Sequence, residues 1–125
     1  MKTRTTLALL ALTFAIDGLA AKARDEVPPA TPDGKPQSCI PISGIRESKV
    51  RDDRTIDFFM GGRRVYRNVL PQSCPSLGFE KAFSYETSLN QLCSTDIITV
   101  FRQGMPRMRG PSCGLGQFQS VTGVK

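Results

Sequence analysis

The strongest structural signal in this chain is residues 55–70, which read TIDFFMGGRRVYRNVL. Apolar, β-branched and aromatic residues lie on both sides of Gly61-Gly62-Arg63, and the two glycines can adopt the positive φ angles that a short hairpin loop needs. We therefore predict two antiparallel strands, Thr55–Met60 and Arg64–Leu70, joined by a three-residue loop.

The length of this loop sets which residues of the two strands face each other. A three-residue loop places Phe58 opposite Tyr66 and Asp57 opposite Arg67, which pairs two aromatic rings and pairs a carboxylate with a guanidinium. A two-residue loop would instead place Phe58 opposite Val65. On the three-residue register Asp57 and Arg67 form an exposed ion pair on the outward face, and the inward face consists of Ile56, Phe58, Met60, Tyr66 and Leu70.

Four more strands are expected around this hairpin. Ile45–Val50 precedes it through a turn at residues 51–54, where two aspartates can accept hydrogen bonds from nearby backbone N–H groups. The other expected elements are strands at Lys81–Glu86, Ile97–Arg102 and Leu115–Val121, one short helical segment at Thr87–Leu92, and a loop at Gln103–Pro111. Six short strands on one core predict a mostly β fold, either a small antiparallel barrel or a strongly curled sheet, because closure removes exposed strand edges. A two-layer β-sandwich is the alternative.

Residues 1–23 are predicted to be a secretory signal peptide. A positively charged start precedes an apolar run from Leu7 to Ile16, and Ala21 and Ala23 place small side chains two residues apart. The run is shorter than the roughly 20 apolar residues that a membrane-spanning helix needs. We expect cleavage near Ala23 and a periplasmic or secreted mature protein with no membrane span.

The mature chain is predicted to have a tether and one domain. Residues 24–38 hold four prolines and several charged residues, which favours a disordered tether because little apolar surface is available for burial. Residues 39–125 are expected to form a single β domain. One hydrophobic core is only marginally sufficient at this size, so disulfides are expected to stabilise it.

Four cysteines, all beyond the predicted signal peptide, indicate two disulfides in an oxidising compartment. Three pairings are open. We choose Cys74 with Cys93, which would clamp the most irregular stretch of the chain, and Cys39 with Cys113, which would tie the ends of the domain together. A zinc site is disfavoured because its ligands normally come in pairs two to four residues apart, and these cysteines are widely spaced. We therefore expect no bound metal.

The absence of histidine limits the chemistry that this chain can perform. It excludes Ser-His-Asp and Cys-His catalysis and the usual imidazole metal site. Carboxylates could still act as acid and base, and the candidates are Asp52, Asp53, Asp57, Glu80, Glu86 and Asp96. The adjacent Asp52 and Asp53 are more simply explained as a solvated turn. We predict no catalytic residue and no cofactor.

The chain carries a net charge of +6 at pH 7. Arg63, Arg64 and Arg67 could contact an anionic surface, together with the ring of Tyr66. Acidic residues are interleaved with the arginines, however, and a core position for Tyr66 is preferred. With two tyrosines and no tryptophan available for stacking, we expect no specific nucleic-acid binding.

Several short motifs suggest a family. They are Val50-Arg51-Asp52-Asp53-Arg54-Thr55-Ile56, Arg63-Arg64-Val65-Tyr66, Cys74-Pro75-Ser76-Leu77, Leu92-Cys93-Ser94-Thr95-Asp96 and Cys113. In their order the chain resembles a bacterial family of small, signal-peptide-bearing, four-cysteine exported proteins whose domain has no known function. The resemblance implies a bacterial exported protein, and it implies no activity, substrate or catalytic residue.

Three functions follow from these observations. The leading hypothesis is a non-enzymatic module of the bacterial envelope that binds an unknown protein or envelope component, or has a structural role. The second is an envelope-acting enzyme or enzyme inhibitor that uses the loops at Pro71–Phe79 and Gln103–Ser112. The third is electrostatic binding of an anionic polymer through the arginine cluster.

Overall fold

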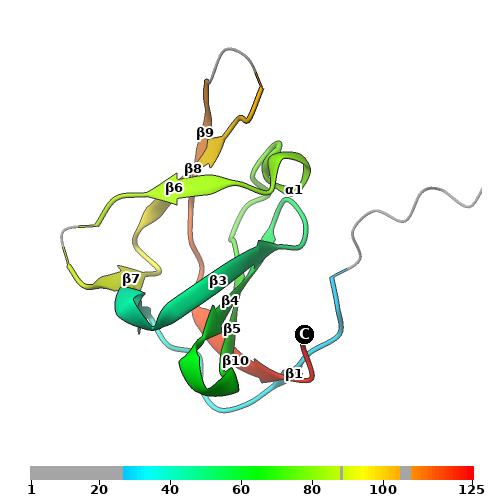
Figure 1. The fold of residues 1–125 in the computed structure, drawn as a ribbon, viewed down its shortest axis with the longest axis vertical. Coiled ribbons are helices and arrows are strands. Elements are labelled where there is room, and N and C mark those ends of the chain that lie inside the picture. The colour runs from blue at the N-terminus through cyan, green and yellow to red at the C-terminus, as the bar shows by residue number, and fades with distance from the viewer. Residues whose placement is uncertain (1–26, 88, 105–107) are drawn as a thin grey trace, which may run out of the picture.

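The computed structural model describes residues 27–87, 89–104 and 108–125 (Figure 1), so the predicted signal peptide lies outside the described residues. The described part is mostly β, as predicted. It contains one short helix, α1 (Leu77–Glu80), and two single 3-10 turns, η1 (Ile42–Gly44) and η2 (Gly61–Arg63). The strands are β1 (Thr31–Pro32), β2 (Cys39–Pro41), β3 (Ile45–Val50), β4 (Thr55–Met60), β5 (Val65–Val69), β6 (Phe83–Tyr85), β7 (Gln91–Cys93), β8 (Ile97–Phe101), β9 (Arg109–Gly114) and β10 (Phe118–Thr122).

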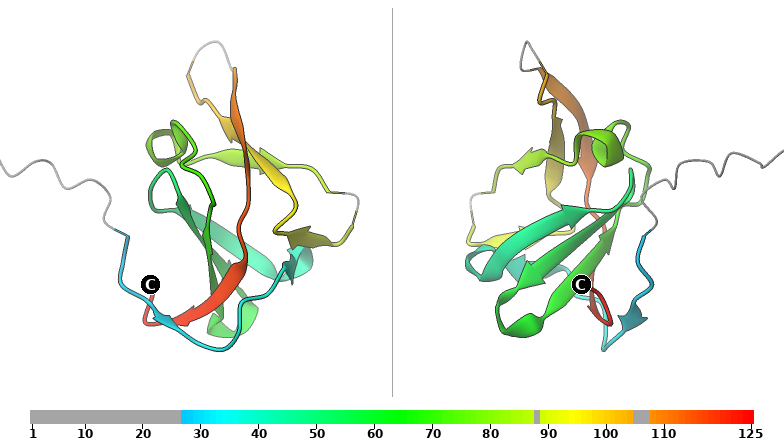
Figure 2. Two further views of the ribbon diagram at one scale, coloured as in Figure 1. Left: turned by 180° about the vertical axis from the view of Figure 1, so that it is seen from behind. Right: turned by 45° about the vertical axis from the view of Figure 1, so that its right-hand side comes forward.

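The strands form three antiparallel sheets. The largest has the order β1-β10-β5-β4-β3, the second has the order β6-β8-β9, and β2 pairs with β7. The chain passes directly from β9 in the second sheet to β10 in the first, which is the orange-to-red run in Figure 2. Within the described residues these pairings do not close into a barrel, so the architecture is curled or sandwich-like.

The predicted hairpin is confirmed in register and in the bounds of its first strand, whereas its second strand is β5 at Val65–Val69 instead of the predicted Arg64–Leu70. Strand β4 begins and ends as expected, Phe58 faces Tyr66, and Asp57 faces Arg67. Gly62 adopts a positive φ of 74° in the loop, a conformation that glycine reaches without a Cβ clash. Strand β3 also has its predicted bounds, and the turn after it is capped because Asp52 Oδ1 accepts a hydrogen bond from the Arg54 N–H.

The core lies on the predicted inward face of this hairpin. Phe58 is fully buried and meets the rings of Phe83 and Phe118 edge-on, with centroid distances of 6.3 and 5.6 Å. Phe83 belongs to the three-stranded sheet and Phe118 to the five-stranded sheet, so the Phe58 ring contacts side chains of both sheets. All five residues predicted to face inward are buried: Ile56, Phe58, Met60, Tyr66 and Leu70.

The predicted helical segment at Thr87–Leu92 is wrong. Gln91–Cys93 forms β7 instead, because Leu92 is fully buried opposite Ile40 of β2, and this long-range pairing overrides a local helical pattern. The helix of the structure is α1, which is anchored by the buried Leu77. No helix in the described ranges has the length and apolar character needed to cross a membrane.

The predicted loop at Gln103–Pro111 is only partly correct. Its end already belongs to β9, which begins at Arg109 and pairs with β8. Pro111 cannot donate a ladder hydrogen bond, but β9 is one of the two edge strands of its sheet, where a proline is tolerated.

Both predicted disulfide pairings are also wrong. The structure pairs Cys39 with Cys93 and Cys74 with Cys113. Because β7 is a strand rather than a helix, Cys93 faces Cys39 directly across the β2–β7 ladder, with 4.0 Å between the Cα atoms. The second bridge ties the segment before α1 to the edge strand β9.

The segment predicted to be a disordered tether is ordered where the structure describes it. β1 pairs with β10, the Asp33 N–H donates to the Ser120 carbonyl at 2.8 Å, and Gln37 exchanges two backbone hydrogen bonds of 2.8 Å with Phe118. These bonds satisfy the backbone groups of β10, which would otherwise be an open edge strand. Main-chain pairing does not require apolar side chains, and for this reason a proline-rich composition did not reveal it.

Candidate functional site

The three arginines predicted to contact an anionic surface do not act together. Arg63 and Arg64 are exposed at the η2 turn. The Arg67 side chain is only 13% exposed, and its Nε and Nη2 donate to the Asp57 carboxylate at 2.8 and 3.0 Å. Arg67 is therefore withdrawn from the surface, and Arg64 Nη1 donates to the Tyr66 hydroxyl at 3.4 Å.

Asp57 is buried, which corrects the expectation of an exposed ion pair. Its side chain is 0% exposed and also accepts a hydrogen bond of 2.9 Å from Arg51 Nε. Residues 51, 57 and 67 thus form a cluster of two guanidiniums around one carboxylate on the outer side of the five-stranded sheet. Removing an ionised carboxylate from water is costly. The hydrogen bonds that Asp57 accepts from the two guanidiniums offset this cost.

Three further candidate carboxylates hold the backbone of loops and turns. Asp52 caps the turn before β4, Asp53 Oδ1 accepts from the Gly78 N–H at 2.7 Å, and Glu80 Oε2 accepts from the Gln103 N–H at 3.2 Å. The structure therefore brings none of these three toward another carboxylate in a pocket.

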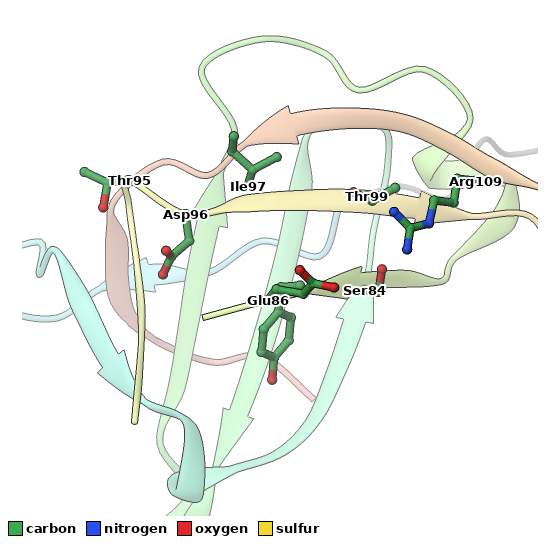
Figure 3. A pocket seen from close by; sticks show the side chains of 8 residues that line it. Ser84, Glu86, Thr95, Asp96, Ile97, Thr99 and Arg109 are labelled. Carbon is green, nitrogen blue, oxygen red and sulfur yellow. The ribbon is translucent and has the colours of Figure 1, made fainter. Parts of the chain in front are cut away.

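The remaining two candidates, Glu86 and Asp96, share a pocket of about 380 Å³ on the outer face of the three-stranded sheet. Figure 3 shows Asp96 at one end of it, Arg109 at the other, and the Ser84 hydroxyl between the carboxylate of Glu86 and the guanidinium of Arg109. The lining residues come from β6, β8, β9 and the segments that flank them: Ser84, Tyr85, Glu86, Thr95, Asp96, Ile97, Thr99 and Arg109.

The charged groups of this pocket differ in how they are held. Asp96 Oδ2 accepts a hydrogen bond of 2.6 Å from the Cys93 N–H, which fixes the carboxylate against the turn before β8. Among the described residues, the side chains of Glu86 and Arg109 have neither a hydrogen-bond nor an ion-pair partner. A carboxylate and a guanidinium thus line one pocket without pairing with each other.

The pocket offers charged and hydrogen-bonding groups to a polar ligand. It offers the hydroxyl groups of Ser84, Thr95 and Thr99, but the chain has no imidazole to activate them. Thr99 Oγ1 is also engaged, at 2.9 Å from Ser112 Oγ. What remains is charge and hydrogen-bond complementarity toward a polar ligand.

A second surface surrounds Phe79, which is 86% exposed at the centre of α1. Three contacts fix the position of the short helix that carries Phe79. Leu77 is fully buried, Gly78 is bonded to the Asp53 carboxylate, and the chain just before the helix is fixed by the disulfide of Cys74. An aromatic ring is therefore displayed to solvent on a well-anchored support.

The backbone on both sides of α1 is strained. Ser76 and Lys81, the residues that bound the helix, have φ angles of 71° and 54°. Positive φ is unfavourable for residues that carry a Cβ and costs roughly 1 kcal/mol or more at each position. Such strain persists only where the surrounding contacts impose it, and it is found preferentially at functional sites.

The β8–β9 hairpin lies beside α1 and adds two exposed apolar side chains, Phe101 at 38% and Met108 at 53%. The bond from the Gln103 N–H to Glu80 ties the start of the hairpin loop to the helix, and the Phe101 N–H donates to Ala82 just beyond it. Both views in Figure 2 place this hairpin and α1 at the same end of the molecule. We call Phe79, Phe101 and Met108 the apolar tip.

Two of the three residues of the apolar tip lie in loops that the sequence had indicated. Phe79 and Met108 lie in the two loops, Pro71–Phe79 and Gln103–Ser112, that were assigned to the enzyme or inhibitor alternative. Nothing in the local pattern indicates which of their residues are displayed. The grouping of Glu86 with Arg109 depends on β6 and β9 flanking β8, and it had no sequence signal.

Comparison with protein-family models, with curated proteins and with solved structures found no match for this chain.

Proposed function

We propose that this protein is a non-enzymatic exported binding module that docks on a partner protein through the apolar tip. The observation that carries the proposal is Phe79, which is 86% exposed on a strained but firmly anchored turn. Aromatic side chains dominate the energetics of protein interfaces, and an anchor held rigidly before binding loses little conformational entropy in the complex.

The surroundings of the tip favour a partner with an apolar pocket and acidic residues near it. Phe101 and Met108 expose further apolar surface on the hairpin beside α1, and exposed Arg102 lies next to Phe101 in that hairpin. Arginine is enriched at interfaces, where its guanidinium can pair with carboxylates at the edge of a pocket. Complementary charge of this kind would speed association and orient the partner.

Two disulfides support the export part of the proposal, because such bonds persist in oxidising compartments. Cleavage near Ala23 and membership of the bacterial exported family stay predictions. Intact-mass analysis of the exported protein tests the first: we expect a chain that starts at or within a few residues of Arg24, and a full-length cytosolic product would contradict it.

The docking proposal is tested by quantitative capture from a native periplasmic extract. The immobilised baits are the mature protein, the variant Phe79→Ala and the control variant Arg63→Gln with Arg64→Gln. We expect one identified partner that the mature protein and the arginine variant retain equally. Phe79→Ala should weaken its binding by about 30-fold or more, as for an aromatic anchor in an interface.

Truncation of Phe79 should leave the fold intact, because the ring is exposed and its neighbour Leu77 remains buried. Unchanged thermal unfolding of Phe79→Ala would establish this. Equal capture of a partner by Phe79→Ala and the mature protein would refute docking through the tip. Loss of binding in the arginine variant alone would favour the electrostatic alternative.

A further inference from the structure

We propose that the pocket over β6-β8-β9 is a separate small-ligand site that takes a diamino carboxylic acid, a molecule with one carboxylate and two ammonium groups. This site differs from the apolar tip in both chemistry and occupant. The proposal stands independently of partner docking, since it rests on the charged and hydroxyl groups of the pocket.

The charge of the pocket defines the class of ligand. Glu86 and Asp96 contribute two carboxylates and Arg109 contributes one guanidinium, so the lining carries one excess negative charge. A ligand that neutralises each of these groups carries two cations and one anion. A simple anion would meet two carboxylates, and a simple diamine would leave Arg109 without a partner.

The arrangement of the charges defines how the ligand lies. Arg109 is directly opposite Phe101 on the β8–β9 ladder, whereas Asp96 immediately precedes β8 at the other end. Four residue-to-residue steps along β8 lead from Ile97 to Phe101, a length of about 13 Å along an extended strand. The ligand carboxylate would bind Arg109, one ammonium would bind Glu86, and the second would reach Asp96.

The groups between the charges suit this orientation. The Ser84 hydroxyl lies between Arg109 and Glu86 and can bond the polar end of the ligand (Figure 3). Ile97 is 59% exposed beside the acidic end, where it can contact the methylene chain of a long side chain. A volume of about 380 Å³ falls in the range of small-ligand sites.

The free charges are the second argument for a ligand. Glu86 and Arg109 line one pocket, yet among the described residues no ion pair joins their side chains. A zwitterion placed between them satisfies both groups, and charge-assisted hydrogen bonds of this type are the stronger ones. Because the pocket is open to solvent, we expect a weak affinity, with a Kd of about 1 mM.

The test is an NMR titration of the mature, isotope-labelled protein with L-lysine and three analogues that each lack one charged group. These are 6-aminohexanoate without the α-ammonium, norleucine without the ε-ammonium, and cadaverine without the carboxylate. We expect L-lysine to shift the backbone signals of residues 84–86 and 95–99. Each analogue should bind about 10-fold more weakly, as for the loss of one charge-assisted contact.

Matched variants assign the contacts. Arg109→Gln should weaken L-lysine binding about 10-fold and leave cadaverine binding unchanged, whereas Glu86→Gln should weaken both. Arg63→Gln, at the η2 turn, should alter neither. Because Glu86 and Arg109 have exposed side chains without partners among the described residues, both pocket variants should unfold at the temperature of the unmodified protein.

Three results would overturn the proposal: no shifts at 20-fold excess over the expected Kd, shifts confined to residues outside the pocket, or equal binding of L-lysine and cadaverine. A lysine-containing dipeptide and Nα-acetyl-lysine distinguish a free amino acid from a peptide terminus. None of these outcomes bears on the Phe79 capture experiment, so the two proposals fail separately.

Discussion

Replacing Asp57 by alanine probes the buried ion cluster on the outer side of the five-stranded sheet. The carboxylate accepts three hydrogen bonds of 2.8 to 3.0 Å from Arg51 and Arg67, whose side chains are 16% and 13% exposed. Alanine would remove both hydrogen-bond acceptors of the largely buried Arg67 guanidinium and would leave Arg51 only its bond from Nη2 to the Lys125 carbonyl oxygen. Breaking a buried ion pair by removing one partner costs about 3–5 kcal/mol.

Since both arginines keep some access to water, we expect a loss near the lower limit, about 3 kcal/mol. For a domain of this size a loss of about 3 kcal/mol lowers the unfolding midpoint by roughly 12–24 °C. The measurement is a guanidinium chloride titration followed by circular dichroism, with both disulfides intact. The slope of the transition should stay unchanged, since the variant keeps the same fold.

Two further variants make this test specific. Glu47→Ala removes an exposed carboxylate from the edge strand β3, and it should change the free energy of unfolding by less than about 0.5 kcal/mol. Replacing the whole cluster by Asp57→Leu, Arg51→Met and Arg67→Met should recover much of the stability, because no charge is then left buried. A loss below about 1 kcal/mol for Asp57→Ala would refute the reasoning and restore the exposed ion pair that the sequence predicted.

Three other predictions follow from the core, the backbone and the disulfides. Phe58→Ala should cost about 3–5 kcal/mol in a denaturant titration, since the fully buried ring joins the two larger sheets; a loss below about 1 kcal/mol would place it outside the core. Gly116→Ala should cost about 1–3 kcal/mol by the same assay, because the added Cβ would overlap the Val69 carbonyl oxygen, and a neutral result would contradict this close approach. Non-reducing peptide mapping should recover two cross-linked pairs, and any other pairing would contradict the fold around β7: Cys39 with Cys93, and Cys74 with Cys113.

Local features of the sequence were sufficient for the hairpin and its neighbour. Strands β3 and β4, the turn between them and the three-residue loop before β5 were all predicted, because alternation of side chains and glycine in a tight loop are properties of adjacent residues. The register then placed Phe58 correctly in the core. Distant parts of the chain were not needed for these assignments.

Pairings between distant segments lay beyond such reasoning. Strands β1, β2 and β7 are two or three residues long and have no periodic pattern, and they exist because a remote strand supplies backbone partners. The disulfide partners depend on the β2–β7 ladder, so an error about β7 became an error about both bridges. The candidate site shows the same dependence, since Glu86 and Arg109 meet only across the three-stranded sheet.

Composition alone established that the sequence has no histidine, four cysteines and a positive net charge, and the order of residues added the alternating strands around a glycine loop. The tertiary structure decided the burial of Asp57, the display of Phe79 and the pocket between Glu86 and Arg109. The physical reason is that alternation assigns a side chain to a face of a sheet, whereas burial depends on what covers that face. Asp57 lies on the outward face, as its position in the strand predicts. Arg51, which directly follows β3, and Arg67 of β5 cover it and remove it from water.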